Sequence, residues 1–415
     1  MSKILSFALT ICICLGLMQC TNNPVSSNDR DPSKLTMAEK GLVESDNNFG
    51  FKLFKEIINE EKDKNVFISP LSVAMALGMT YNGANGNTQD AMQKTLELSG
   101  LTLQEINDSY KNLTELLINL DPKVKFQIAN SIWYREIFPV EDKFVDINKT
   151  YFDAEVRGLD FSKPDASNII NGWVNEKTNG KIEKIVDDVI NPLTMMFLIN
   201  AVYFKGIWTY EFDKSKTQDD TFTLPDGSKK SCKMMAQESE FQYFENDDFQ
   251  AIDLPYGDGD FRMTIFLPRL QNNVDSLIAE LNQENWTKWI NSFSKQKLTL
   301  QLPKFTIEYE IKLNDVLKAL GMEIAFDPEQ ADFTKMYKEE KVKANLYISK
   351  VKHKTFVQVD EEGTEAAAVT SVEMSIKAVM PPKLLMRIDR PFIFAIRENR
   401  SGTILFIGKI VEPTL

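Results

Sequence analysis

The sequence predicts an α+β fold in which helices and strands are interleaved within a single domain. Three observations support this prediction. Apolar residues recur at helical spacing in the first part of the chain, the last third is mostly extended, and neither an internal repeat nor a low-complexity linker interrupts residues 46–413. With 415 residues and a hydrophobic content of 43%, the chain can bury a large core.

Five helices are expected in the first half of the chain. Phe49, Leu53 and Ile57 are among the apolar residues that recur at helical spacing in the first of them. Ser69-Pro70 opens the second helix, and Thr88 is expected to cap the third. The expected helices cover 46–60, 69–80, a segment starting at Thr88, 101–120 and 166–178.

The expected strands follow the apolar runs. The nearly continuous run 194–204 suits a strand that is buried on both faces. Two runs within 241–266 flank Gly257-Asp258-Gly259-Asp260, which favours a hairpin turn over a calcium site because further ligands at loop spacing are lacking. The other expected elements are strands at 126–134 and 298–309, helices at 274–290 and 313–320, and extended segments at 346–359, 384–388, 392–396 and 404–410.

Residues 1–20 are predicted to be a signal peptide, because Lys3 precedes an apolar run, Ile4 to Leu17, that is short for a membrane span. Leu17-Met18-Gln19-Cys20 resembles a bacterial lipoprotein box, so Cys20 is a candidate for lipidation and for a membrane tether. Ordinary secretion with cleavage nearby is the alternative. Both interpretations place the folded part outside the cytoplasm. Residues 21–45 are then a flexible tether, and 46–415 form the domain.

The four cysteines do not form a disulfide framework. Cys12 and Cys14 lie inside the leader, and lipidation of Cys20 would leave Cys232 without a partner in the chain. Stability must therefore come from the core.

Composition disfavours several function classes. The net charge is −12, with no basic stripe that could gather phosphates, so nucleic acid is not an expected partner. His353 is the single histidine, which leaves a catalytic triad or a histidine-based metal site without essential parts. No cofactor or metal is expected, because a Gly-rich phosphate loop and a CxxC pair are lacking. Glu361 and Glu362 would point to opposite faces of a strand and could not act together on one bond.

The segment from Glu361 to Lys377 fits two secondary structures. Its Ala-rich part has helical propensity, yet from Thr364 onwards small and apolar residues alternate on one face. From Glu361 onwards, no proline occurs until Pro381. Such a segment can stay outside a sheet and enter it later as a strand with one buried face.

Five separated motifs make the chain similar to the serpin family over nearly all of the mature protein. They are Asn65-Val66-Phe67-Ile68-Ser69-Pro70-Leu71-Ser72, Asn200-Ala201-Val202-Tyr203-Phe204-Lys205-Gly206-Ile207-Trp208, Leu302-Pro303-Lys304-Phe305, Glu361 to Ala368, and Asp389-Arg390-Pro391-Phe392-Ile393-Phe394.

The resemblance implies a serpin fold with three β-sheets surrounded by helices and an exposed reactive loop at about 363–382. It also implies that the protein is an inhibitor and not an enzyme. A target protease attacks the loop and forms an acyl-enzyme, after which the cleaved loop inserts into the large sheet and drags the protease with it. The partner is therefore a serine protease, or alternatively a cysteine protease, and a monomer is expected.

The resemblance also assigns roles to single residues. Counting from Gly363 places the reactive bond at Lys377-Ala378, which suits trypsin-like proteases, with Met374, Ile376 and Met380 as alternatives. The remaining roles are a hinge of Glu361, Gly363, Thr364, Ala366, Ala367 and Ala368; a shutter beneath the sheet of Ser69, Ser72, Asn200 and His353; and a breach, where insertion begins, of Trp208, Lys304 and Glu361.

Two other functions remain open. A non-inhibitory serpin-like scaffold could carry a ligand or act as a chaperone, although such a protein would be expected to have bulk, charge or proline in the hinge. An enzyme that uses carboxylates ranks last.

Overall fold

The computed structural model describes residues 34–342, 345–364 and 384–414. The signal peptide, Cys20, the hinge alanines Ala366, Ala367 and Ala368, and the Lys377-Ala378 bond lie outside the described residues. Residues 35–415 form one compact unit.

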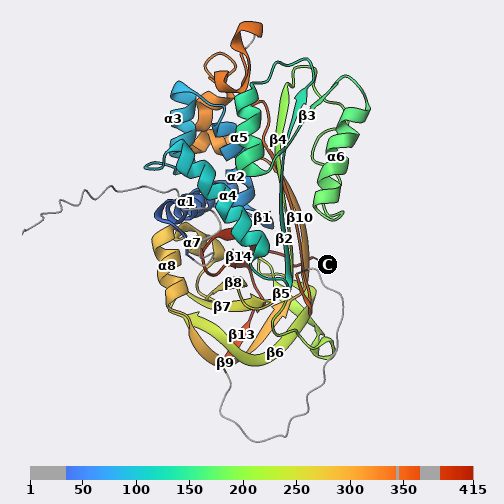
Figure 1. The fold of residues 1–415 in the computed structure, drawn as a ribbon. Coiled ribbons are helices and arrows are strands. Elements are labelled where there is room, and N and C mark those ends of the chain that lie inside the picture. The colour runs from blue at the N-terminus through green and yellow to red at the C-terminus, as the bar shows by residue number, and fades with distance from the viewer. Residues whose placement is uncertain (1–33, 343–344, 365–383, 415) are drawn as a thin grey trace, which may run out of the picture. The chain divides into compact units, whose positions relative to one another are not determined.

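Helices and strands are interleaved along the described chain (Figure 1). The α-helices are α1 (Met37–Glu60), α2 (Pro70–Tyr81), α3 (Gly86–Thr95), α4 (Leu103–Asn119), α5 (Asp142–Phe152), α6 (Asp165–Lys177), α7 (Val274–Ala279), α8 (Gln283–Asn291) and α9 (Asn314–Leu317). The strands are β1 (Val66–Ile68), β2 (Val124–Arg135), β3 (Glu155–Leu159), β4 (Met196–Ile207), β5 (Gln218–Thr223), β6 (Lys229–Glu245), β7 (Phe249–Tyr256), β8 (Phe261–Pro268), β9 (Ser294–Pro303), β10 (Phe305–Lys312), β11 (Lys352–Val359), β12 (Gly363–Thr364), β13 (Leu384–Arg387), β14 (Phe392–Glu398) and β15 (Ile404–Ile410).

The strands of the described chain form two hydrogen-bonded networks. One has nine strands in the order β1-β15-β14-β8-β7-β6-β9-β13, with β5 on the side of β6. The 17-residue strand β6 pairs with β5, β9 and β7 in turn along its length. This strand therefore joins into one network two of the three sheets that the family resemblance implies. The predicted α+β fold class, with helices and strands interleaved, is confirmed.

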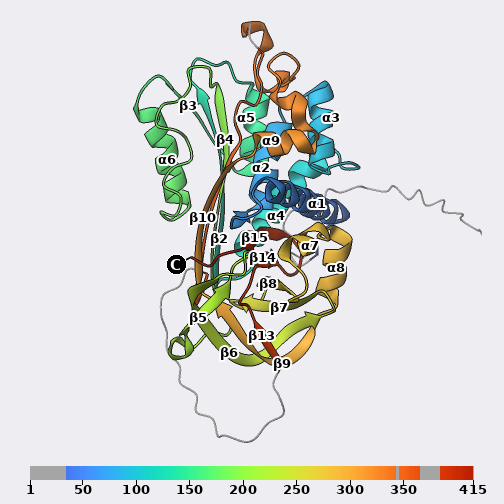
Figure 2. The same cartoon turned by 180° about the vertical axis from the view of Figure 1, so that it is seen from behind.

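The second network is a six-stranded sheet in the order β10-β11-β12-β4-β2-β3. Helix α2 packs against β4 on one face, and α6 contacts β2 and β4 on the opposite face, as both views show (Figures 1 and 2). The sheet is therefore covered on two sides, and the short strand β12 lies in its middle.

Two helix starts differ from the sequence prediction. Helix α1 begins at Met37, inside the expected tether, because Thr36 and Glu39 form a capping box in which each side chain bonds the other's backbone. Helix α3 begins before Thr88, which is not its cap. Thr88 is buried within the helix, and its hydroxyl oxygen accepts from the backbone N–H of Asp332 at 2.8 Å.

Two expected elements are each split in two. The predicted strand 298–309 breaks at Lys304, where the chain leaves the nine-stranded network and enters the six-stranded sheet. The predicted helix 274–290 breaks before Asn282, whose side chain caps α8 by accepting from the Asn285 N–H at 2.8 Å. Apolar residues lie on both sides of each break. In the strand, their alternation changes phase at the break, from Leu298, Leu300 and Leu302 to Phe305, Ile307 and Tyr309.

The expectation that 194–204 is buried on both faces is also wrong. The first three residues of β4 are half-buried, and after them Asn200 and Val202 are half-buried whereas Ile199, Ala201 and Tyr203 are buried. The reason is that β12 fills the position next to β4 only at Gly363 and Thr364.

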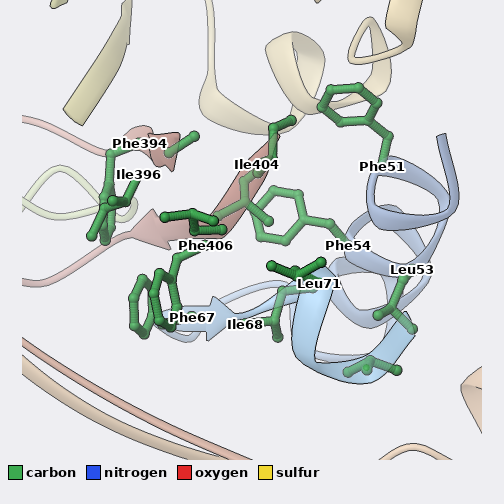
Figure 3. Close-up of a cluster of buried hydrophobic side chains, with 14 of the residues drawn as sticks. Phe51, Leu53, Phe54, Phe67, Ile68, Leu71, Phe394, Ile396, Ile404 and Phe406 are labelled. Carbon is green, nitrogen blue, oxygen red and sulfur yellow. The ribbon is translucent and has the colours of Figure 1, made fainter. Parts of the chain in front are cut away.

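The core brings α1 and α2 against β1, β14 and β15 (Figure 3). Phe67 stacks between Phe394 and Phe406, with ring centroids at 5.5 and 5.1 Å. Gly408 makes room for this stack, because a Cβ there would lie 2.7 Å from the Phe394 ring. None of the described helices is long and apolar enough to cross a membrane.

Asp46 in α1 is an exception within this core. It is 3% exposed, Oδ1 accepts from the Tyr110 hydroxyl at 2.9 Å, and the buried Oδ2 has no hydrogen-bond partner. Burial raises the pKa of Asp46 to about 8, although the Tyr110 bond lowers it in part. The carboxyl is therefore mostly protonated at neutral pH.

Asp46→Asn is expected to stabilise the protein at pH 7 by about 2–4 kcal/mol. Between about pH 4 and 8 the unfolded chain loses the Asp46 proton and the folded chain keeps it, so this group lowers the free energy of unfolding as pH rises. Denaturant unfolding of both proteins at pH 5 and pH 8 measures the difference. Equal differences at the two pH values would contradict the assignment.

Candidate functional site

The hinge begins inside the six-stranded sheet. Gly363 and Thr364 form β12, which pairs with β4 through Gly363↔Ile207 and Thr364↔Gly206, and with β11 through Thr364↔Val359. The segment that the sequence predicts to enter a sheet thus has its first two residues in place between two strands.

Gly363 fits this position because it has no side chain. Its φ is +155°, and a Cβ there would lie 2.1 Å from the carbonyl oxygen of Gly206. Its own carbonyl accepts from the Asp360 N–H at 3.0 Å, which closes the turn between β11 and β12. Any larger residue would separate β12 from β4.

Thr364 is held by a hydrogen bond within the core. It is 3% exposed, and its hydroxyl lies 2.6 Å from the hydroxyl of Tyr256. Tyr256 stacks on Trp208 with ring centroids 4.3 Å apart and planes at 13°. Burial raises the pKa of Tyr256 well above its usual value, so the phenol stays neutral and able to donate.

Trp208 fixes the turn that leads into β12. Its backbone N–H donates to the Glu362 carbonyl at 2.8 Å, and its indole Nε1 donates to the Asp360 carbonyl at 3.0 Å. The Phe212 N–H reaches the Glu361 carbonyl at 2.8 Å. The segment that follows β4 therefore holds the turn at residues 360–362 through hydrogen bonds to the backbone carbonyls of the turn. These bonds do not depend on the side chains of the turn.

The predicted breach residues do meet. Lys304 Nζ lies 2.7 Å from Glu361 Oε2, and the Thr217 hydroxyl donates to Oε1 at 2.8 Å. Burial raises the pKa of Glu361, but the bonds from Lys304 and Thr217 outweigh it and leave the pKa below its usual value. With only 6% of the Glu361 side chain exposed, this pair is less screened than a surface salt bridge. Glu362 adds a second ion pair with Lys214.

The predicted shutter residues are joined in one chain of hydrogen bonds, because the Ser72 backbone N–H donates to the Ser69 hydroxyl oxygen at 3.2 Å. Ser69 donates its backbone N–H to His353 Nε2 at 3.0 Å and its hydroxyl to the Leu405 carbonyl at 2.7 Å. Ser72 reaches the Asn200 carbonyl at 3.5 Å. Among the described residues, no hydrogen bond joins His353 to Asn200. His353 thus ties β11 to the start of α2 and not to β4.

Beyond Thr364, β4 and β11 have an open space between them. Within the described chain no backbone pairing joins these two strands directly. A cavity of about 480 Å³ lies there, and we call it the slot. Its lining includes Ile199 and Asn200 of β4, Lys352 and His353 of β11, and Ser72, Val73 and Ala76 of α2.

Several residues of this site had no signal in the sequence. Tyr256 lies 108 residues before Thr364, next to a turn that suggested only a hairpin. Asn130 belongs to none of the sequence motifs, yet its Oδ1 accepts a hydrogen bond from the side chain of Asn200 at 2.7 Å, between β2 and β4. Such partners follow from the register of the sheet, which the motifs do not encode.

His353 is expected to make stability depend on pH in the acid range. Burial lowers its pKa to about 4, so between pH 6.5 and 4 the unfolded chain binds a proton that the folded chain rejects. Stability is therefore lost as pH falls through this range, by about 2 kcal/mol between pH 6.5 and 5. His353→Gln keeps an acceptor for Ser69 and should remove this loss.

The His353 experiment is best done in the Asp46→Asn background. The wild-type contributions of Asp46 and His353 have opposite slopes between about pH 4 and 6.5 and partly cancel. Unfolding curves of Asp46→Asn with and without His353→Gln then isolate the histidine. An unchanged acid slope after His353→Gln would contradict its role.

The chain has many relatives of one kind. The family model described as Serpin (serine protease inhibitor) matches residues 44–413. An uncharacterized serpin-like protein of Thermococcus kodakarensis is 36% identical, covering 96% of this chain and 95% of its own length. Human neuroserpin is 36% identical, covering 85% of this chain and 87% of its own length.

Solved structures agree with these sequence matches. The crystal structure of tengpin, a thermophilic serpin, in its native state has a TM-score of 0.82 at 35% identity and covers 89% of this chain and 94% of its own. Human thyroxine-binding globulin in complex with its hormone has a TM-score of 0.81 at 29% identity, covering 91% of this chain and all of its own. Both match residues on either side of the hinge as one fold.

Proposed function

Because this chain belongs to the serpin family, we propose that it inhibits trypsin-like serine proteases as a suicide substrate. The observation that carries this proposal is the position of β12 between the C-terminal ends of β4 and β11, two strands whose N-terminal parts line the slot. The loop that a protease would cut is joined directly to a strand that already lies in the sheet.

The proposed reaction uses the protease's own chemistry. The protease serine attacks the carbonyl carbon of Lys377, the Lys377-Ala378 bond breaks, and the amine of Ala378 leaves with a proton from the protease. An ester then joins Lys377 to the protease. From Gly363 to Lys377 is 14 steps along the chain, which spans ~46 Å as a strand at ~3.3 Å per residue. The attached protease would travel that far if the segment enters the slot.

The hinge sequence is suited to such an insertion. Ala366-Ala367-Ala368 carries no side chain large enough to obstruct entry between two strands. The close approach of β12 to β4 supports this argument, because a Cβ on Gly363 would clash with the carbonyl oxygen of Gly206. Strand addition would also fill the space between β4 and β11 with backbone hydrogen bonds.

Mixing the protein with trypsin is expected to give an adduct that survives denaturing electrophoresis. Mass spectrometry of the released C-terminal peptide should place the cut at Lys377-Ala378. A cut at Met374, Ile376 or Met380 by another serine or cysteine protease would move the reactive bond without changing the mechanism. Cleavage at Lys377 without any adduct would contradict inhibition.

A binding function is the second candidate. It is favoured by the similarity to thyroxine-binding globulin, a protein solved with thyroxine bound. A non-inhibitory scaffold or chaperone would predict cleavage without a covalent adduct and with unchanged heat resistance. The small residues of Ala366-Ala367-Ala368 favour inhibition over this candidate.

We also propose that the protein works as a monomer outside the cytoplasm, secreted or held at a membrane by a lipid on Cys20. Metabolic labelling with a radioactive fatty acid tests the anchor. Label that is lost in Cys20→Ser supports the anchor, and an unlabelled wild-type protein rejects it.

A further inference from the structure

Two lysines lie side by side on the face of the six-stranded sheet that α6 covers, which we call the outer face. Lys125 of β2 and Lys205 of β4 are directly opposite each other in the antiparallel pairing of these strands. The Cβ atoms of such a pair lie about 5 Å apart, and like charges at that spacing destabilise a sheet. The sheet therefore has a local excess of positive charge at the end of β4 that binds β12.

The contacts of neighbouring residues show that both lysines point to the outer face. Nζ of Lys125 donates to Asn179 Oδ1 at 2.9 Å, and Asn179 follows directly after α6. Phe204, the neighbour of Lys205, packs in the core against Tyr256, with ring centroids 5.1 Å apart. Because successive side chains of a strand point to opposite faces, Lys205 lies on the outer face.

Lys205 has no partner of opposite charge. Its side chain is half-buried, yet within residues 34–342, 345–364 and 384–414 no hydrogen bond or ion pair engages its ammonium group. Other lysines close to the hinge and to the start of β2 are each paired with a carboxylate: Lys304 with Glu361, Lys214 with Glu362, and Lys123 with Asp258. A half-buried cation without a partner would gain from a carboxylate placed beside it.

The register of β12 indicates which carboxylate could reach this position. Thr364 is opposite Gly206, so one step further along both strands brings position 365 opposite Lys205. The residue at this position is Glu365. Since Thr364 points into the core, the next side chain of a continued strand would point to the outer face, as Lys205 does. On the β11 side, position 365 falls opposite the uncharged Gln358.

We propose that Lys205 is a positioning residue for loop insertion and pairs with the carboxylate of Glu365 when residues 365–377 enter between β4 and β11. This inference rests on the proposed function, because it adds a role within the same insertion. The incoming carboxylate offsets the repulsion between Lys125 and Lys205. It also fixes the register, because a slip of one residue would direct Glu365 into the core, where an unpaired charge is costly.

The test uses the mature protein and a synthetic peptide with the sequence of residues 365–377, acetylated at its N-terminus and labelled with a fluorophore at its C-terminus. Fluorescence anisotropy measures the dissociation constant. A Glu365→Gln peptide should bind about threefold more weakly than the wild-type peptide, as expected for one cross-strand ion pair. Lys205→Gln should weaken the wild-type peptide by the same factor and bind both peptides equally. The difference should shrink at about 1 M salt.

Exchange of the two charges separates an ion pair from a structural effect of either residue. Lys205→Glu should bind the wild-type peptide more weakly still, and a Glu365→Lys peptide should restore binding to within about twofold of the wild-type pair. Lys295→Gln is the matched control. Lys295 is exposed on β9 in the other network, so its loss removes the same charge and should leave both dissociation constants unchanged.

Three results would overturn the proposal: equal binding of the two peptides to the wild-type protein, no binding of either peptide, or charge exchange that does not restore binding. The proposed function is judged separately by the adduct with trypsin, which involves no peptide. An adduct together with equal peptide binding would reject the pair and keep inhibition. A threefold difference between peptides without any adduct would keep the pair and reject inhibition.

Discussion

Thr364→Arg is expected to convert the inhibitor into a substrate, with the yield of covalent adduct falling more than about tenfold while loop cleavage stays fast. Thr364 is 3% exposed and bonded to Tyr256. A guanidinium there would be buried without a partner, which costs several kcal/mol, so in the intact variant β12 is expected to leave its place between β4 and β11. Insertion would then have to bury the charge and would be slowed or blocked, and the ester would have time to hydrolyse.

The yield is measured by denaturing electrophoresis after mixing with trypsin, together with the rate at which cleaved inhibitor accumulates. Thr364→Ser is the matched control, because it keeps the hydroxyl that meets Tyr256 and should inhibit like the wild type. Retention of the adduct in Thr364→Arg would contradict insertion through β12.

Tyr256 illustrates which part of the site the sequence can predict. The resemblance identified Thr364 and Trp208 by their motifs, and the structure brings both to the C-terminal end of β4. Tyr256 joins them from β7, in the other network, and no local pattern at its position points to a residue 108 places away. Residues whose role depends on tertiary contacts alone cannot be found from sequence motifs or from hydrophobic periodicity.

Lys304 shows the same limit for the fold. The short apolar runs that form α2 and β15 were predicted almost to the residue, because nearly every residue of both elements is buried. In the run 298–309 the alternation of apolar residues shifts by one position between Leu302 and Phe305, and the chain changes sheets at Lys304 between them. An apolar pattern indicates that a residue is buried, but it does not indicate which neighbouring element covers that residue.

The shutter was identified by resemblance, and in the structure hydrogen bonds link its four residues in the order His353, Ser69, Ser72 and Asn200. Ser69 and His353 are hydrogen-bonded as expected, but Asn200 pairs with Asn130 across β2 and β4. The bonds that would resist widening of the slot therefore run from β11 through Ser69 and Ser72 to β4, and from β4 to β2. The two sides of the slot are thus linked through the start of α2, and within the described chain no backbone pairing joins them directly.

Cleavage of the loop is expected to raise the melting temperature by more than about 10 °C. On the order of ten new strand bonds at roughly 1 kcal/mol each would form if 365–377 filled the space between β4 and β11. For a chain of this length, each kcal/mol raises the melting temperature by about 1 °C. Burial of the small face of the segment adds to this. The uncleaved protein is then less stable than the form it reaches once cut.

Calorimetry of the intact protein and of protein nicked within 365–377 tests this account most directly, with the cut located by mass spectrometry. The account predicts a melting transition at least about 10 °C higher for the nicked wild type, and little or no rise for nicked Thr364→Arg. Equal melting temperatures for intact and nicked wild-type protein would contradict it.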